Sequence, residues 1–191
     1  MAETLNDARD AVARIEHKGF TFLDRDLKPA DWSFAAMCAE SRRIGACLQS
    51  LGLKKGDRLA LVLSSPEDFV LCFLGAIDAG LLPVPMYPPM ALGRLDSYMD
   101  RAQGILRVSG AKALLTTRDL VPVLQPARGA VATLQSILEM ETLERQDGSA
   151  PLRQGIAQPE EACFLQFTSG STSAPRGVIV THRNLLANAR A

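Results

Sequence analysis

Apolar and polar residues follow two different rhythms in the first part of the chain. The run FTFLD, Phe20 to Asp24, alternates the two kinds of residue and predicts a short strand after an amphipathic opening helix. Between Ser33 and Gly52 the apolar residues instead recur at helical spacing, mostly on one face. Ser33 is a suitable N-cap and Gly52 a natural C-terminal stop, so a helix is predicted between them.

The middle of the chain repeats a strand and helix pattern. A turn at Lys54–Asp57 precedes RLALVLSS, whose continuous apolar stretch is typical of a strand buried on both faces. The predicted elements are a strand at 58–65, a helix at 67–79, a strand at 83–86, a helix at 95–108 and a strand at 112–117. This order is that of parallel crossover units. The sequence therefore predicts an α/β fold with a parallel-rich sheet and helices on both of its faces.

The last third of the chain is less regular. Residues 125–159 contain an apolar segment, VATLQSILEMETL, that fits either a strand or a helix, and both alternatives stay open. The runs at Ala162–Phe167 and Gly177–Thr181 are both strand-like, so the residues between them are predicted to form a loop that joins two strands of a sheet. His182 follows the second strand, and its favoured role is to end that strand and begin a helix rather than to act in catalysis.

Composition and charge limit the possible partners. The 191 residues are 47% hydrophobic, which is enough for one substantial core. The 21 basic and 21 acidic side chains cancel, so no long-range field favours nucleic acid or an anionic membrane surface. The start lacks the pattern of a secretory signal, and the most apolar run, Phe69–Ile77, is too short to cross a bilayer. We therefore expect a cytoplasmic protein without a transmembrane segment, whose partner is small.

Metal and disulfide chemistry is not indicated. The cysteines stand singly among apolar neighbours, with no C-x-x-C pair, and the chain has only two histidines. Buried thiols that form no disulfide are the simplest interpretation of Cys38, Cys47, Cys72 and Cys163.

The predicted loop between the last two strands has the composition of a phosphate-binding loop. Its sequence is TSGSTSAPRG, with hydroxyl groups on Thr168, Ser169, Ser171, Thr172 and Ser173. Gly170 and Gly177 permit close backbone approach, Arg176 adds a permanent cation with donors that match phosphate, and Pro175 restricts the loop before binding. An ordinary flexible surface turn uses the same residue types and remains the alternative.

Two common nucleotide-binding motifs are excluded. A Walker A loop needs G-x-x-x-x-G-K-[ST] leading into a helix, whereas these two glycines are seven positions apart and precede a predicted strand. No G-x-G-x-x-G is present either, so the dinucleotide-binding fingerprint is absent.

The ordered run TSGSTSAPRGV, followed by THRN, closely resembles the phosphate-binding signature of adenylate-forming enzymes. That superfamily comprises acyl-CoA synthetases, luciferases and peptide-synthetase adenylation domains. It usually has Gly where this chain has Ser173 and Lys where it has Arg176. Arginine keeps the charge of lysine but not its shape.

A second stretch resembles one branch of the superfamily. Residues 69–117, and above all the core AGLLPVPMYPP, look like the corresponding region of fatty acyl-AMP ligases, which commonly show A-G-x-x-P-V-P-x-Y-P-P. By themselves, Pro83, Pro85, Pro88 and Pro89 suggest only a rigid connection after a helix, so this stretch serves as a family marker and not as a catalytic site.

The resemblance implies a function that needs more chain than is present. It covers residues 20–191, and by this likeness residues 1–191 are a partial N-terminal AMP-binding domain without the adenine-pocket motif, the acidic ribose-binding motif and the C-terminal domain. In a complete enzyme of this kind, a fatty-acid carboxylate attacks the α-phosphorus of ATP, accompanied by Mg²⁺, and forms an acyl-adenylate. The acyl group then passes to a thiol of an acyl carrier protein or polyketide synthase, or to coenzyme A if the enzyme is an acyl-CoA synthetase. A non-catalytic binding or assembly domain with a vestigial loop is the alternative of another class.

The resemblance also assigns site residues by motif position. The β- and γ-phosphates would be held by Thr168, Ser169, Gly170, Ser171 and Thr172, with Arg176 contributing charge and Gly177 closing the loop. No residue of this stretch is implied to be catalytic, because such a loop acts by positioning and by neutralising charge. We expect the 191-residue chain alone to show no turnover and weak nucleotide affinity at best.

Overall fold

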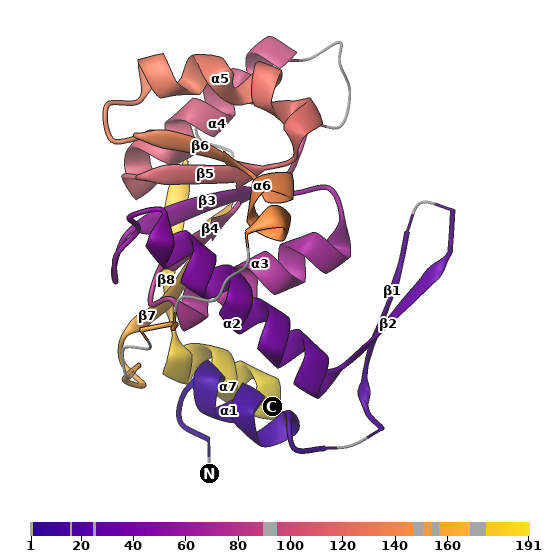
Figure 1. Ribbon diagram of the computed structural model, residues 1–191. Coiled ribbons are helices and arrows are strands. Elements are labelled where there is room, and N and C mark those ends of the chain that lie inside the picture. Colours follow the sequence, from indigo (N-terminus) through magenta and orange to yellow (C-terminus); the bar gives the residue numbers. More distant parts are fainter. Residues whose placement is uncertain are drawn as a thin grey trace.

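The computed structural model describes residues 2–15, 17–24, 26–89, 95–146, 151–153, 157–168 and 175–191 (Figure 1). The described helices are α1 (Leu5–Val12), α2 (Phe34–Ser50), α3 (Pro66–Asp78), α4 (Leu95–Ser109), α5 (Val121–Ala130), α6 (Met140–Arg145) and α7 (His182–Arg190). The described strands are β1 (Gly19–Leu23), β2 (Pro29–Ser33), β3 (Arg58–Val62), β4 (Leu82–Pro85), β5 (Ala113–Thr116), β6 (Ser136–Glu139), β7 (Ala162–Thr168) and β8 (Arg176–Thr181).

A four-stranded parallel sheet forms the centre of the molecule. Its strand order is β4-β3-β5-β6, and all three strand pairs are parallel. Pro83 and Pro85 lie within β4, which is an edge strand of this sheet and therefore tolerates residues without an N–H donor. The predicted parallel α/β architecture is confirmed.

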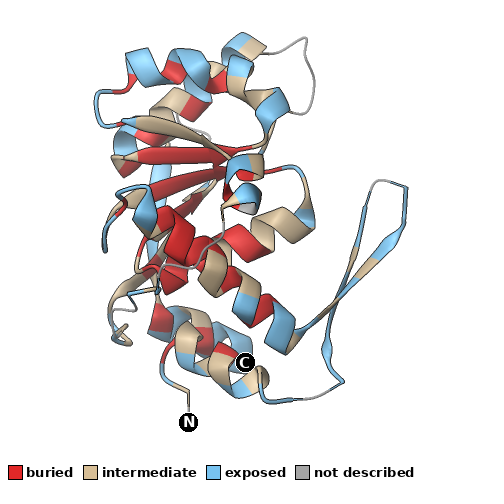
Figure 2. Ribbon diagram, viewed as in Figure 1, coloured by how far each residue is buried: buried red, intermediate tan, exposed pale blue. Residues whose placement is uncertain are grey.

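Helices cover both faces of this sheet, as predicted. Alternate residues of β3 point to opposite sides: Leu59 and Leu61 join an apolar cluster with α2 and α3, while Ala60 and Val62 join a second cluster with α4 and α5. Figure 2 shows β3 and β5 as buried, apart from Arg58 at the start of β3. The core is thus two apolar layers separated by one sheet.

A buried polar group fixes α1 against the body of the protein. Asp78, at the end of α3, forms an ion pair with Arg9 of α1. The Asp78 carboxylate also accepts hydrogen bonds from Ser41 Oγ at 3.0 Å and Asn6 Nδ2 at 3.2 Å. Because Asp78 and Arg9 are 1% and 7% exposed, the two charges compensate each other in a place that water barely reaches.

The C-terminal helix α7 lies beside α1 (Figure 1). The sequence predicted a helix beginning at His182. Thr181 caps α7 through a capping box with Asn184, and α1 supplies the surface on which it packs. Two segments at opposite ends of the chain therefore meet.

Three sequence predictions change in detail. The predicted strand at 20–24 pairs with β2, which was not predicted, in an antiparallel hairpin that projects from the body (Figure 1). The strand predicted to reach Ser65 ends at Val62, because the Ser65 hydroxyl instead accepts the Asp68 N–H as the N-cap of α3. The ambiguous segment contains both alternatives, since β6 passes directly into α6 at Met140.

Candidate functional site

The loop singled out in the sequence joins β7 to β8, which pair antiparallel as a hairpin. Thr168 is the last residue of β7, Arg176 is the first of β8, and the two are paired across the hairpin. Gly177 follows and is paired with Phe167. The predicted site residues Ser169, Gly170, Ser171 and Thr172 lie outside the described residues. The prediction of a strand on each side of these residues is confirmed, and the two strands form a two-stranded sheet of their own.

The hairpin separates its polar residues from its packing residues. Directly paired residues of an antiparallel ladder share a face, and successive residues alternate between faces. Thr168 and Arg176 therefore lie on one face, and both are exposed. Phe167 and Gly177 lie on the other, where Phe167 packs against the apolar cluster that contains Ala102 of α4. The hydroxyl and the guanidinium are thus presented to solvent at the mouth of the loop.

The C-terminal end of the loop makes two close contacts, one on each side of Arg176. A methyl group on Gly177 would lie 2.8 Å from Cζ of Phe167, so any larger residue there would push that ring aside. On the other side, Pro175 meets Gly104 of α4, where a methyl group would lie 3.0 Å from Cγ of Pro175. These two contacts restrict the backbone on both sides of Arg176.

The electrostatics of the described loop ends suit an anion. Within the described ranges, no hydrogen bond or ion pair engages the Thr168 hydroxyl or the Arg176 guanidinium. Arginine carries a permanent charge and a planar fork of donors that can hold two phosphate oxygens. The arrangement can orient a polyphosphate and neutralise its charge, but these two side chains supply no general base.

His182 stands at the opposite end of β8 and has a structural role. It is the first residue of α7, it is 3% exposed, and its Nδ1 accepts a hydrogen bond from the Leu5 N–H at 3.2 Å. Burial lowers the pKa of His182, although the carboxylates of Glu161 and Asp7 oppose that change. A neutral imidazole is what the contact with Leu5 needs. The expectation that His182 ends a strand and begins a helix is confirmed.

No candidate metal site is present in the part of the chain that the structure describes. No three His, Cys, Asp or Glu side chains gather there in a group that could hold a metal ion. The four cysteines are all buried, as predicted, and none forms a disulfide. Burial raises the pKa of Cys163 to about 12, so this thiol stays protonated near neutral pH.

Among the described helices, none is long and apolar enough to span a bilayer.

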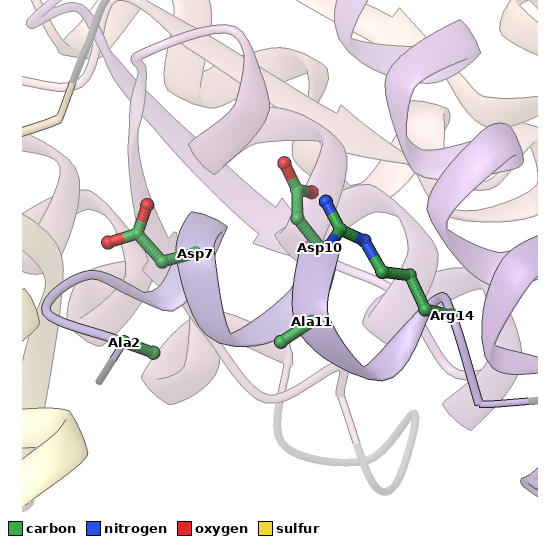
Figure 3. A pocket seen from close by; sticks show the side chains of 5 residues that line it. All are labelled: Ala2, Asp7, Asp10, Ala11 and Arg14. Carbon is green, nitrogen blue, oxygen red and sulfur yellow. The ribbon is translucent and has the colours of Figure 1, made fainter.

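A surface hollow of about 400 Å³ lies on α1 and does not belong to the site (Figure 3). Its lining residues are Ala2, Asp7, Asp10, Ala11 and Arg14, none of which comes from the hairpin. The Asp7 carboxylate already accepts the Thr4 N–H in a capping box, and the Asp10 carboxylate already pairs with Arg42. Both carboxylates are therefore already engaged within the chain, and we give the hollow no ligand.

Two residues around the hairpin were missed by sequence reasoning. Gly104 contacts Pro175 and Phe167 contacts Gly177, yet neither Gly104 nor Phe167 belongs to the recognisable motif. A weak signal was present for Gly104: a glycine in the middle of the helical run RAQGILR is disfavoured by about 1 kcal/mol relative to alanine and asks for a packing reason. Nothing in the local sequence marks Phe167.

The family follows from a comparison with known proteins. The model of the family described as AMP-binding enzyme matches residues 8–191. The chain belongs to this family. The match includes every element from α1 to α7, apart from the first residues of α1, and therefore contains the whole β7–β8 hairpin.

Individual members of the AMP-binding enzyme family resemble the chain closely. A long-chain-fatty-acid–AMP ligase, FadD26 of Mycobacterium marinum, is 33% identical over 187 residues, which cover 93% of this chain and 30% of that protein. A putative acyl-CoA synthetase of Caulobacter vibrioides is 34% identical over 158 residues, covering 81% of this chain and 26% of that protein.

A solved structure shows the same fold. The fatty acyl-adenylate ligase from L. pneumophila, in complex with acyl adenylate and pyrophosphate, superposes with a TM-score of 0.84 at 29% identity, over 100% of this chain and 32% of that one. The chain thus spans about a third of the length of the family members that it matches.

Proposed function

We propose that this chain is the N-terminal part of an ATP-dependent fatty acyl-AMP ligase. The observation that carries the proposal is the similarity to the long-chain-fatty-acid–AMP ligase FadD26 over 93% of the chain, with the hydroxyl-rich loop inside the matched region. The structure of the related L. pneumophila ligase holds acyl adenylate and pyrophosphate, which are the two products of such an adenylation.

The proposed reaction joins a fatty acid to the nucleotide. A carboxylate oxygen of the fatty acid attacks the α-phosphorus of ATP. The bond between that phosphorus and the oxygen that bridges to the β-phosphate breaks, and pyrophosphate leaves with the electron pair. The acyl-adenylate that remains is a mixed anhydride, so a thiol can later displace AMP from its carbonyl carbon.

In this proposal the hairpin binds the leaving pyrophosphate. Arg176 neutralises charge on the β- and γ-phosphates, and the hydroxyl of Thr168 donates to their oxygens from the paired position. By motif position, Ser169, Gly170, Ser171 and Thr172 complete the loop, with Gly177 at its end. Mg²⁺ would arrive on the phosphates of ATP and add to the charge neutralisation, since hard oxygen ligands of that kind suit it.

A second candidate, an acyl-CoA synthetase, is favoured by one observation. The putative acyl-CoA synthetase of C. vibrioides is as similar to the chain as FadD26, at 34% identity. The two functions share the adenylation step and differ in the thiol that receives the acyl group. That acceptor is a phosphopantetheine on an acyl carrier protein or polyketide synthase in the first case, and coenzyme A in the second.

The test is pyrophosphate release by the complete product of the reading frame that encodes this chain. With ATP and a long-chain fatty acid we expect pyrophosphate and acyl-AMP. Adding a holo carrier protein should then discharge the acyl-AMP, and discharge by coenzyme A instead would favour the synthetase. Absence of pyrophosphate with every chain length would favour a non-catalytic binding or assembly domain.

The 191-residue chain provides a second test. We propose that it shows no turnover and binds ATP weakly, because a loop that holds phosphates lacks contacts to base and ribose. Tight ATP binding by isothermal titration calorimetry would contradict this.

A cytoplasmic location belongs to the same proposal, because the reaction consumes ATP, and cell fractionation tests it.

A further inference from the structure

We propose that Gly104 of α4 is a positioning residue that lets the helix support the phosphate-binding hairpin at Pro175 and so places Arg176. This inference rests on the proposed function of the hairpin. It concerns a residue on a different element, 71 positions away from Pro175 in the sequence, as their residue numbers show.

The backbone conformation of Gly104 does not explain why this residue is a glycine. It lies in the middle of α4, a helix from Leu95 to Ser109, and its backbone is not in the left-handed region that favours glycine. Glycine is among the poorest residues for a helix interior, because it loses the most conformational freedom on folding. The reason for glycine at this position is therefore sought in its surroundings.

The ring of Pro175 lies directly against Gly104. A methyl group on Gly104 would lie 3.0 Å from Cγ of that ring, which is closer than ordinary van der Waals contact, and 3.4 Å from its Cδ. The proline ring is closed onto its own backbone nitrogen, so it cannot rotate away as a longer side chain would. A methyl group at position 104 therefore requires the Pro175 ring, its backbone or α4 to give way by a few tenths of an ångström, and a larger side chain requires more.

The helix is the less movable of the two. α4 buries Ala102 and Leu106 completely or nearly so, at 2% and 0% exposure, in the apolar cluster beneath the sheet. Phe167 packs against the same cluster, and its ring lies next to Gly177. The residues on both sides of Arg176 thus rest on the structure around α4, while the Arg176 side chain is exposed. A displacement at Pro175 passes directly to Arg176.

The chain offers a matched control for the test. Gly129 is a helical glycine of α5 at which a methyl group would meet no atom within 4 Å. Gly104→Ala and Gly129→Ala therefore make the same chemical change in a helix, but only the first presses on the hairpin. If helix propensity were all that mattered, the two variants would behave alike.

The experiment measures ATP-dependent pyrophosphate release by the complete enzyme. For Gly104→Ala we expect KM for ATP to rise by about threefold to tenfold with KM for the fatty acid unchanged, and for Gly104→Leu a loss of about 10²-fold in kcat/KM for ATP, because small misplacements of charged groups cost this much. Gly129→Ala should match the wild type. The double variant Gly104→Ala with Pro175→Ala should have the same KM for ATP as Pro175→Ala alone, since the ring that the methyl group would meet is gone.

The outcomes separate the two proposals. Pyrophosphate release by the wild type with an unchanged KM for ATP in Gly104→Ala would overturn the role of Gly104 and leave the ligase function standing. If the wild type releases no pyrophosphate, the ligase function fails, and the positioning is judged from amide NMR spectra of the 191-residue chain. There, Gly104→Ala should shift the amide signals of Thr168, Arg176 and Gly177 while Gly129→Ala does not, and equal spectra would overturn the inference.

Discussion

The central sheet and the β7–β8 hairpin use strands in opposite ways. In β3 and β5, Leu59–Val62 and Ala113–Thr116 are buried along their whole length between two helical layers. In β8, Arg176–Ile179 are exposed, with Val178 and Ile179 at 53% and 64%. The sheet therefore contributes most to the stability of the fold, whereas the exposed residues of the hairpin are accessible to a ligand. A substitution should affect stability in the first region and ligand handling in the second.

The largest expected effect tests the stability side of this contrast. Leu115→Ala should lower the free energy of unfolding by about 2–5 kcal/mol, because Leu115 is fully buried and its removal leaves a cavity. The matched variant Ile179→Ala should change it by less than about 0.5 kcal/mol. Urea denaturation measures both. Similar losses in the two variants would mean that the hairpin is as much a part of the core as the sheet.

The next effect tests the ligand side. Arg176→Ala should reduce kcat/KM for ATP in the complete enzyme by about 10²-fold, because one charged donor to the phosphates is lost. Arg176→Lys should keep part of the activity, since it retains the charge but not the fork of donors. Arg183→Ala, which removes an exposed arginine paired with Glu160, is the control and should have little effect. Wild-type kinetics in Arg176→Ala would remove this residue from the site.

A smaller effect concerns packing within the hairpin. Gly177→Val should destabilise the chain by about 0.5–1.5 kcal/mol, because the new side chain meets the ring of Phe167 and forces it out of its preferred rotamer. Thermal unfolding measures the loss. The same substitution in a Phe167→Ala background should cost less, and an equal cost in both backgrounds would show that the ring is not the obstacle.

The smallest effect concerns pH and the junction of α1 with α7. Because burial lowers the pKa of His182, the folded state binds a proton less readily than the unfolded state. Stability is therefore fully present above the ordinary histidine pKa of about 6.5 and is lost as the pH falls below it. Glu161 and Asp7, whose own pKa values are lowered by hydrogen bonds from Lys55 and from Thr4, lose their contributions only at a lower pH.

The measurement is the melting temperature between pH 7.5 and 5.5. The wild type should become less stable over this range, and His182→Gln should flatten the dependence although it starts from a lower stability. A steeper dependence in His182→Gln would contradict the assignment.

Local sequence patterns identified most elements because those elements depend on neighbours in the chain. Ser33 caps α2 and the apolar run of β3 is buried on both faces, as the patterns indicated. The pattern failed where pairing overrides local preference. β2 contains Pro29 and Asp31, which are poor strand formers, and it becomes a strand because β1 pairs with it. The boundary at Met140 between β6 and α6 is set by the pairing of β6 with β5.

The candidate site divides in the same way. The sequence by itself determined which chemical groups the loop carries, since hydroxyls, glycines and a guanidinium are properties of the residues and their order. Only the tertiary structure decided the strand order β4-β3-β5-β6, the face on which Arg176 is presented, and the contact of Pro175 with Gly104. The physical reason is that these depend on packing between segments far apart in the chain, where shape and excluded volume decide which residue meets which, and no local periodicity encodes that.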